Sequence, residues 1–149
     1  MTKILFVCHG NICRSPMAEF ILKDMVRKVE IADQFEIDSA ATSTEEIGNP
    51  LYYAARQILM QHGIPCEGHH ARQLTKGDGD YFDLLIGMDY ANIRNMRRIC
   101  PQAENKIKLL LSYTNRPGEV DDPWYSGDFK TAWRDIEEGC RGLLATVKG

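Results

Sequence analysis

Hydrophobic and polar positions along this chain follow two periods, one typical of strands and one typical of helices. Residues 3–8 form a nearly continuous apolar run, which is typical of a parallel strand covered on both faces. Residues 35–40 alternate apolar and polar side chains, and short apolar runs return at 83–88 and 106–110. These runs predict four strands.

Helical patterns follow the predicted strands. The first is predicted to begin with Ser15 as N-cap and Pro16 in the first helical position, where a missing amide hydrogen costs nothing. Met17, Ile21 and Met25 then repeat at the spacing of one helix face. The other predicted helices cover about residues 51–62, closed by Gly63, 89–100, stopped by Pro101, and 129–147, capped by Asp128.

The alternation of strand and helix predicts an α/β fold with a parallel sheet and right-handed crossovers. A length of 149 residues is typical of one domain, and no internal repeat or linker composition divides the chain. The long irregular stretch over residues 115–127 is of the kind that usually carries function or is disordered.

Composition excludes several classes of protein. Eighteen Lys and Arg against 21 Asp and Glu give a net charge of −3, unlike a nucleic-acid binder or a polybasic membrane anchor. No apolar run approaches the roughly 18 residues of a membrane span, and the N-terminus lacks a secretory cleavage site. Five cysteines without disulfide-framework spacing indicate free thiols in a reducing cytoplasm.

The segment after the first predicted strand reads Cys8-His9-Gly10-Asn11-Ile12-Cys13-Arg14-Ser15-Pro16. It lies where ligands collect in open parallel sheets, and its amides can form an anion nest strengthened by the helix that follows. Gly10 permits close backbone approach, and Asn11 tolerates the left-handed conformation that such a loop needs. Arg14 supplies a planar fork for two phosphoryl oxygens. The segment therefore predicts a phosphate-binding loop.

Cys8 lies in the same positive field, which favours its thiolate at neutral pH and allows attack on phosphorus. The hydroxyl of Ser15 could donate to the sulfur and stabilise it. A free cysteine at the end of an apolar strand is often only a buried core residue. The loop context, with Gly and Asn between a strand and a helix opened by proline, favours catalysis.

A thiolate that displaces a phenolate needs a proton donor for the departing oxygen. Asp122 precedes Pro123 in the irregular stretch, and Trp124 and Tyr125 follow. An Asp-Pro pair is often only the start of a turn. Beside the predicted nucleophile, however, Asp122 is the best acid candidate, and shielding by the two aromatic side chains should keep it protonated.

These residues resemble a low-molecular-weight protein tyrosine phosphatase over essentially the whole chain. The motifs that carry the resemblance are Val7-Cys8-x5-Arg14-Ser15-Pro16, Asp38-Ser39-Ala40, His69-x-Ala71-Arg72-Gln73, Met88-Asp89 and Asp122-Pro123. The resemblance implies one domain over residues 1–149, with a four-stranded parallel sheet in a flavodoxin-like or Rossmann-like arrangement flanked by helices. It also implies no cofactor and no metal, and Cys66 with His69 and His70 lacks standard zinc spacing.

By the same resemblance, Cys8 forms a phosphocysteine intermediate, Arg14 holds the phosphoryl oxygens, and Asp122 protonates the leaving tyrosine oxygen. The substrate is then a phosphotyrosine-containing protein and inorganic phosphate is product and inhibitor, with no nucleic-acid or membrane partner. Cys13 is expected to trap oxidised Cys8 as a reversible disulfide. Asp89 matches a family aspartate near the loop, although helix capping explains it equally well.

The resemblance also implies a network that supports the loop. In the family, the strained backbone at Asn11 is held by hydrogen bonds of its side chain to partners that match Ser15, Ser39 and His69. Without the resemblance, the sequence favours simpler roles: Ser39 would be a hydroxyl at a strand end that bonds local backbone, and His69 would be a surface histidine.

The predicted substrate walls depart from the family. Trp124 and Tyr125 supply one aromatic wall, whereas animal members place an aromatic residue on the other side where this chain has Glu45 or a neighbour. His9, beside the nucleophile, is also unusual for the family. A carboxylate opposite the aromatic wall should disfavour acidic peptides.

Three alternatives remain open on the sequence. An arsenate reductase needs two further cysteines close together, whereas Cys66, Cys100 and Cys140 are widely separated. A protein-arginine phosphatase carries Thr where this loop has Ile12. A phosphocarrier that keeps its phosphocysteine needs no acid, so Asp122 argues against it.

Overall fold

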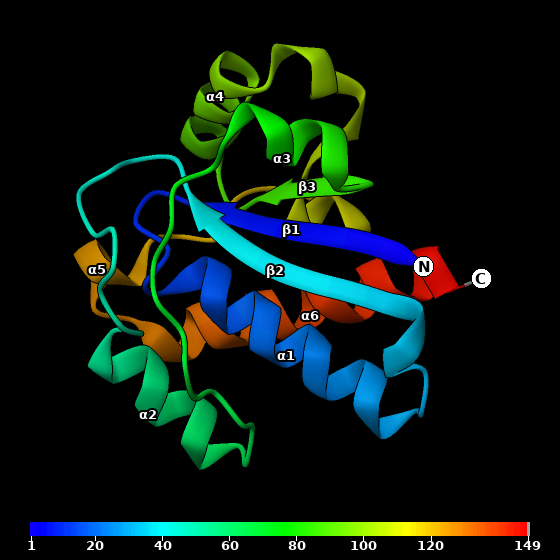
Figure 1. The fold of residues 1–149 in the computed structure, drawn as a ribbon. Helices are drawn as coiled ribbons and strands as arrows, with labels where there is room; N and C mark the ends of the chain where they lie inside the picture. The colour runs from blue at the N-terminus through cyan, green and yellow to red at the C-terminus, as the bar shows by residue number, and fades with distance from the viewer. Residues whose placement is uncertain (149) are drawn as a thin grey trace.

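The structure is a computed structural model that describes residues 1–148, and Figure 1 shows its fold. A four-stranded parallel sheet with the order β2-β1-β3-β4 forms the centre, which confirms the predicted fold class. The strands are β1 (Thr2–Cys8), β2 (Phe35–Ala41), β3 (Leu84–Gly87) and β4 (Ile107–Leu109).

Helices cover both faces of this sheet. In Figure 1, α1, α2 and α6 lie on one face, and α3 and α4 lie on the other. The α-helices are α1 (Arg14–Lys28), α2 (Tyr53–Gln61), α3 (Lys76–Tyr81), α4 (Tyr90–Ile99), α5 (Pro123–Ser126) and α6 (Phe129–Lys148). Short 3-10 helices lie next to the strands in the connections, namely η1 (Ala32–Gln34), η2 (Pro101–Lys106) and η3 (Leu110–Tyr113).

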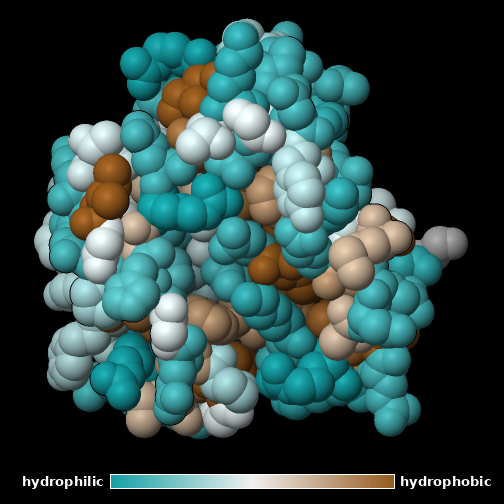
Figure 2. Space-filling view, in the orientation of Figure 1, coloured by the Kyte–Doolittle hydropathy of each residue, from teal (hydrophilic) through white to brown (hydrophobic). Residues whose placement is uncertain are grey.

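The central strand β1 explains why the first apolar run is continuous. Its residues 4–7 are completely buried, because their side chains point alternately into the two helical layers. β1 pairs with β2 from Thr2 opposite Phe35 to Cys8 opposite Ala41, so Cys8 ends the strand at the carboxyl edge of the sheet. Figure 2 shows one face of the molecule, on which most of the surface side chains are hydrophilic.

Several local predictions were wrong in detail. Ser15 is not an N-cap, because α1 already begins at Arg14 and the Ser15 side chain turns back toward Cys8. The helix predicted over 51–62 is shorter, since α2 begins at Tyr53. Helix α3 was not predicted because its six residues include two glycines, which are poor helix formers.

The irregular stretch over residues 115–127 contains the short helix α5, with Asp122 as its N-cap. The predicted caps Asp89 and Asp128 are confirmed, since each carboxylate accepts from a backbone amide in the first turn of α4 or α6. Among the helices described for residues 1–148, none combines the length and the apolar character that crossing a membrane requires.

Candidate active site

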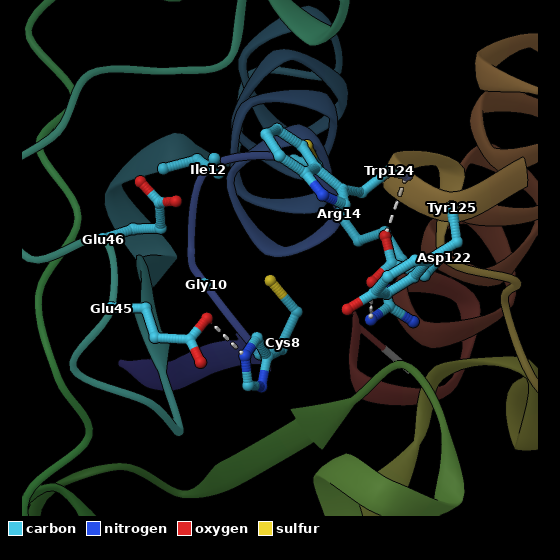
Figure 3. Close-up of a pocket in the computed structure, with 11 residues that line it drawn as sticks. Cys8, Gly10, Ile12, Arg14, Glu45, Glu46, Asp122, Trp124 and Tyr125 are labelled. Carbon is cyan, nitrogen blue, oxygen red and sulfur yellow. Dashed lines mark hydrogen bonds and ion pairs between the residues drawn. The ribbon is translucent and has the colours of Figure 1, made fainter. Parts of the chain in front are cut away.

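The loop between β1 and α1 wraps around the sulfur of Cys8, which points into the cleft drawn in Figure 3. Two backbone amides point at Cys8 Sγ, that of Asn11 at 3.3 Å and that of Ser15 at 3.5 Å. The Ser15 hydroxyl lies 3.0 Å from the same sulfur. Ser15 Oγ accepts from Asn11 Nδ2, so its own hydrogen can go to the sulfur at 3.0 Å or to the more distant Ala40 carbonyl at 3.5 Å. These donors surround the sulfur on the side from which the loop folds over it, as the amides of an anion-binding nest do.

Asn11 holds the loop in its tight turn. Its backbone is left-handed, with φ of 59°, and the residue is completely buried. The side chain donates to Ser15 Oγ at 2.8 Å and accepts from the backbone amide of Arg72 at 3.2 Å. The backbone carbonyl of Asn11 accepts from His69 Nε2 at 2.7 Å. A strained residue persists where its surroundings determine it in this way.

Two predicted contacts of the Asn11 side chain are wrong. His69 bonds the backbone carbonyl of Asn11 and not its side chain, and Ser39 does not bond Asn11. Ser39 Oγ donates instead to Glu19 Oε1 at 2.6 Å, and Glu19 is a buried carboxylate on α1. The side-chain amide of Asn11 is already engaged by Ser15 and Arg72, which leaves the Ser39 hydroxyl to Glu19. Ser39 therefore ties β2 to α1. Sequence reasoning missed Glu19, although an acidic residue beside apolar positions of the first helix was a signal.

Arg14 is 2% exposed and faces two carboxylates. Its Nη1 donates to Asp89 Oδ2 and to the carbonyl of Val120, both at 2.8 Å, and its Nη2 donates to Asp122 Oδ2 at 3.4 Å. Burial lowers the pKa of the Arg14 guanidinium, but the charges of Cys8 and Asp122 and the bond to Asp89 raise it above its ordinary value. Arg14 is therefore a fixed cation beside the sulfur.

Asp89 has both of the roles that the sequence left open. One carboxylate oxygen caps α4 by accepting from the amide of Asn92 at 2.8 Å, and the other accepts from Arg14. Helix capping and orientation of the guanidinium therefore share one side chain.

Asp122 lies at the mouth of the cleft with its side chain 24% exposed. Its Oδ1 accepts from the amide of Trp124 at 3.0 Å, while Oδ2 faces Arg14. Trp124 is 51% and Tyr125 is 83% exposed, so both aromatic side chains lie largely open to solvent at the cleft mouth, and their predicted shielding of Asp122 stays a prediction. Trp124 packs edge-on against Tyr52, at 4.8 Å between ring centroids.

The four predicted wall residues, His9, Glu45, Trp124 and Tyr125, all line the cleft. Figure 3 shows the Glu45 side of the cleft opposite the side with Trp124 and Tyr125. His9 Nε2 donates to Glu45 Oε2 at 3.1 Å. Glu46 also lines the cleft beside Glu45, at a position that the sequence indicated only as a neighbour of Glu45.

The remaining cysteines differ in their relation to this cleft. Cys13 lines it, and burial raises the pKa of its thiol, as do the charges of Cys8 and Asp122. Cys66, Cys100 and Cys140 lie outside it, and none of the five cysteines forms a disulfide. The redox role of Cys13 stays a prediction. Within residues 1–148, no group of three or more His, Cys, Asp or Glu side chains is arranged to hold a metal ion.

A thiol surrounded by amide donors, a fixed guanidinium and a carboxylate at the mouth of the cleft defines the class of phosphatases with a cysteine nucleophile. The family model of the "Low molecular weight phosphotyrosine protein phosphatase" matches residues 3–149. The chain belongs to this family and is a protein tyrosine phosphatase, which confirms the resemblance seen in the sequence.

Individual relatives cover nearly the full length of the chain. The low molecular weight protein-tyrosine-phosphatase YfkJ of Bacillus subtilis is 40% identical, over 99% of this chain and 97% of the relative. Its crystal structure superposes with a TM-score of 0.96 over 99% of this chain and 95% of YfkJ. The human low molecular weight phosphotyrosine protein phosphatase is 42% identical, over 95% of this chain and 92% of the relative.

A further solved structure carries a different activity in its name. The drosophila arginine phosphatase DARP is 33% identical to this chain, with a TM-score of 0.91 over 99% of each chain.

Proposed function

We propose that Cys8, Arg14 and Asp122 carry out the hydrolysis of phosphotyrosine in protein substrates through a phosphocysteine. In the first step, the Cys8 thiolate attacks phosphorus while the bond between phosphorus and the tyrosine oxygen breaks. Asp122 gives its proton to that oxygen, so the product leaves as neutral tyrosine. Arg14 and the loop amides stabilise the charge on the phosphoryl oxygens.

In the second step, a water molecule attacks phosphorus and the bond between sulfur and phosphorus breaks. Asp122, now a carboxylate, accepts the proton from the water, and inorganic phosphate leaves. The sulfur departs as a thiolate, which the Ser15 hydroxyl at 3.0 Å and the two amides favour. The enzyme returns to its starting state, and phosphate at high concentration inhibits it by occupying the same loop.

One observation carries this proposal: three donors converge on a cysteine sulfur at the carboxyl edge of the sheet, in a cleft that a buried guanidinium also lines. The test is a rapid-quench experiment with a radiolabelled phosphotyrosine peptide. We expect the label on Cys8 before phosphate release, and Cys8→Ser should have no measurable turnover while still binding inorganic phosphate. Cys66→Ser, a buried cysteine outside the cleft, is the control. Normal turnover by Cys8→Ser would exclude the covalent mechanism.

We extend the proposal to the surroundings of the enzyme. Five free cysteines, all buried, suit a reducing cytoplasm. The negatively charged cleft mouth at Glu45 and Glu46 is unsuited to nucleic acid, and we propose no membrane partner.

Phosphoarginine is the second candidate substrate, favoured by the likeness to the drosophila arginine phosphatase. Ile12, which lines the cleft, argues for an aryl ester, because the sequence pattern expected of a protein-arginine phosphatase has Thr at this position. A comparison of kcat/KM on phosphotyrosine, phosphoserine and phosphoarginine peptides of one sequence decides between them. A higher value on phosphoarginine would overturn the assignment to tyrosine.

A further inference from the structure

Two neighbouring carboxylates form the side of the cleft that faces Trp124 and Tyr125, as Figure 3 shows. Glu45 is fixed by its hydrogen bond to His9, the residue that follows the nucleophile. Glu46 lies over the phosphate-binding loop, because a Cβ added at Gly10 would be 3.3 Å from Glu46 Cγ. Both carboxylates are thus held at the entrance through which the leaving group passes.

Glu46 is oriented by a second contact. One of its carboxylate oxygens, Oε2, accepts from Asn49 Nδ2 at 2.5 Å. A carboxylate has about four lone-pair sites, so this single bond leaves acceptor capacity for a substrate donor. Glu45 likewise has one bond and a side chain that is 69% exposed.

Of the two basic side chains that line the cleft, Arg14 bonds neither of these carboxylates and His9 bonds only Glu45. Arg14 is buried and already bonded to Asp89, Asp122 and the carbonyl of Val120. Apart from Arg14 and His9, the lining of the cleft, as far as the described chain shows it, contains no basic side chain. The base of the cleft is therefore suited to a phosphate dianion, whereas its Glu45 side is suited to a cation.

We infer that this phosphatase prefers phosphotyrosine whose immediate sequence neighbours are Lys or Arg. The inference rests on the proposed function. With the phosphoryl group in the loop and the ring against Trp124, the chain on either side of the tyrosine passes the Glu45 side. A neighbouring ammonium or guanidinium then pairs with Glu45 or Glu46, and a neighbouring carboxylate is repelled. Because Glu45 is largely exposed, each carboxylate should change kcat/KM by about twofold to fivefold.

The test uses three phosphotyrosine peptides that differ only in the residues before and after the tyrosine, which are Lys, Ala or Glu on both sides. We expect kcat/KM to decrease in that order, and the ratio of the Lys to the Glu peptide to shrink between about 0.05 M and about 0.5 M salt. The Ala peptide separates the two proposals. If it is not hydrolysed, the proposed function fails; if all three peptides are hydrolysed equally, only this inference fails.

Variants of the two glutamates test whether the preference for basic neighbours of the phosphotyrosine arises at the cleft. Glu45→Gln and Glu46→Gln should each lower the ratio of the Lys to the Glu peptide, and the double variant should nearly abolish it. Glu104→Gln is the matched control, because Glu104 is also 69% exposed, lies outside the cleft and changes the net charge equally. An equal effect of Glu104→Gln would assign the preference to the net charge of −3 and overturn the inference.

Discussion

The base of the cleft and its rim are built in opposite ways. At the base, Asn11 and Ser15 are completely buried, and Arg14 is 2% and Cys8 3% exposed. At the rim, Trp124 and Tyr125 on one side are 51% and 83% exposed. On the other side, the exposed Glu45 and the half-buried Glu46 lie next to each other in one loop, each with one side-chain hydrogen bond.

This difference separates reaction from recognition. Donors fixed in a water-poor base need no rearrangement when charge develops on the phosphoryl group, so they stabilise the transition state strongly. Exposed rim groups are solvated before substrate binds, so each changes affinity only modestly. Substitutions at the base should therefore change rate by orders of magnitude, and substitutions at the rim should change the choice of substrate by small factors.

The largest effect after loss of the nucleophile is expected at Asp122, where base and rim meet. Asp122→Ala should lower kcat on phosphotyrosine peptides by about 10² to 10⁴, because the departing oxygen loses its proton donor. The loss should be smaller on an aryl phosphate with an activated leaving group.

A second variant separates proton transfer from helix capping at Asp122. Asp122→Asn keeps an oxygen for the amide of Trp124, so it should retain the thermal stability that Asp122→Ala loses, while being equally slow. Full activity of Asp122→Asn would contradict the acid role.

A smaller loss of rate is expected at Asn11, which touches no reacting atom through its side chain. Asn11→Gly and Asn11→Ala both remove the bonds to Ser15 Oγ and to the Arg72 amide, so kcat/KM should fall by up to about 10² as the loop loosens. Only the alanine variant adds the strain of a left-handed backbone, about 1–2 kcal/mol.

Urea unfolding and kinetics distinguish these two contributions at Asn11. We expect Asn11→Ala to be less stable than Asn11→Gly by about 1 kcal/mol, with a similar loss of kcat/KM. If Asn11→Gly had the activity of the unchanged enzyme, the hydrogen bonds would not be what positions the loop.

The smallest effect is expected at the aromatic rim. Trp124→Ala should raise KM for a phosphotyrosine peptide by about twofold to tenfold, because one aromatic contact contributes about 0.5–1.5 kcal/mol. Tyr53→Ala is the matched control, since Tyr53 is 67% exposed and lies outside the cleft. A change in kcat of about 10² at Trp124 would remove the distinction between rim and base.

Much of the base could be predicted from the sequence because it is local. Cys8, Asn11, Arg14 and Ser15 lie within eight consecutive residues, and the apolar run before them predicts the strand that carries them to the sheet edge. Their spacing along the chain places all four residues at the end of one strand, in the loop after it and in the first turn of the helix that follows. Asp122 lies far from this segment in the sequence, and it could be predicted only because the proposed reaction requires a proton donor for the leaving oxygen.

Contacts between distant segments were decided by the packing of strands and helices. Arg14 meets Asp89 and Asp122 across 75 and 108 positions of sequence, and the Arg72 amide meets Asn11 across 61. The resemblance predicts that Ser39 bonds Asn11. In the structure, the packing of α1 against β2 brings Glu19 within hydrogen-bond distance of Ser39 instead. Likewise, only the folded loop shows that Glu46 lies over Gly10. Periodicity and residue type predict elements and chemistry along the chain, whereas pairing between elements depends on how their apolar faces pack in three dimensions.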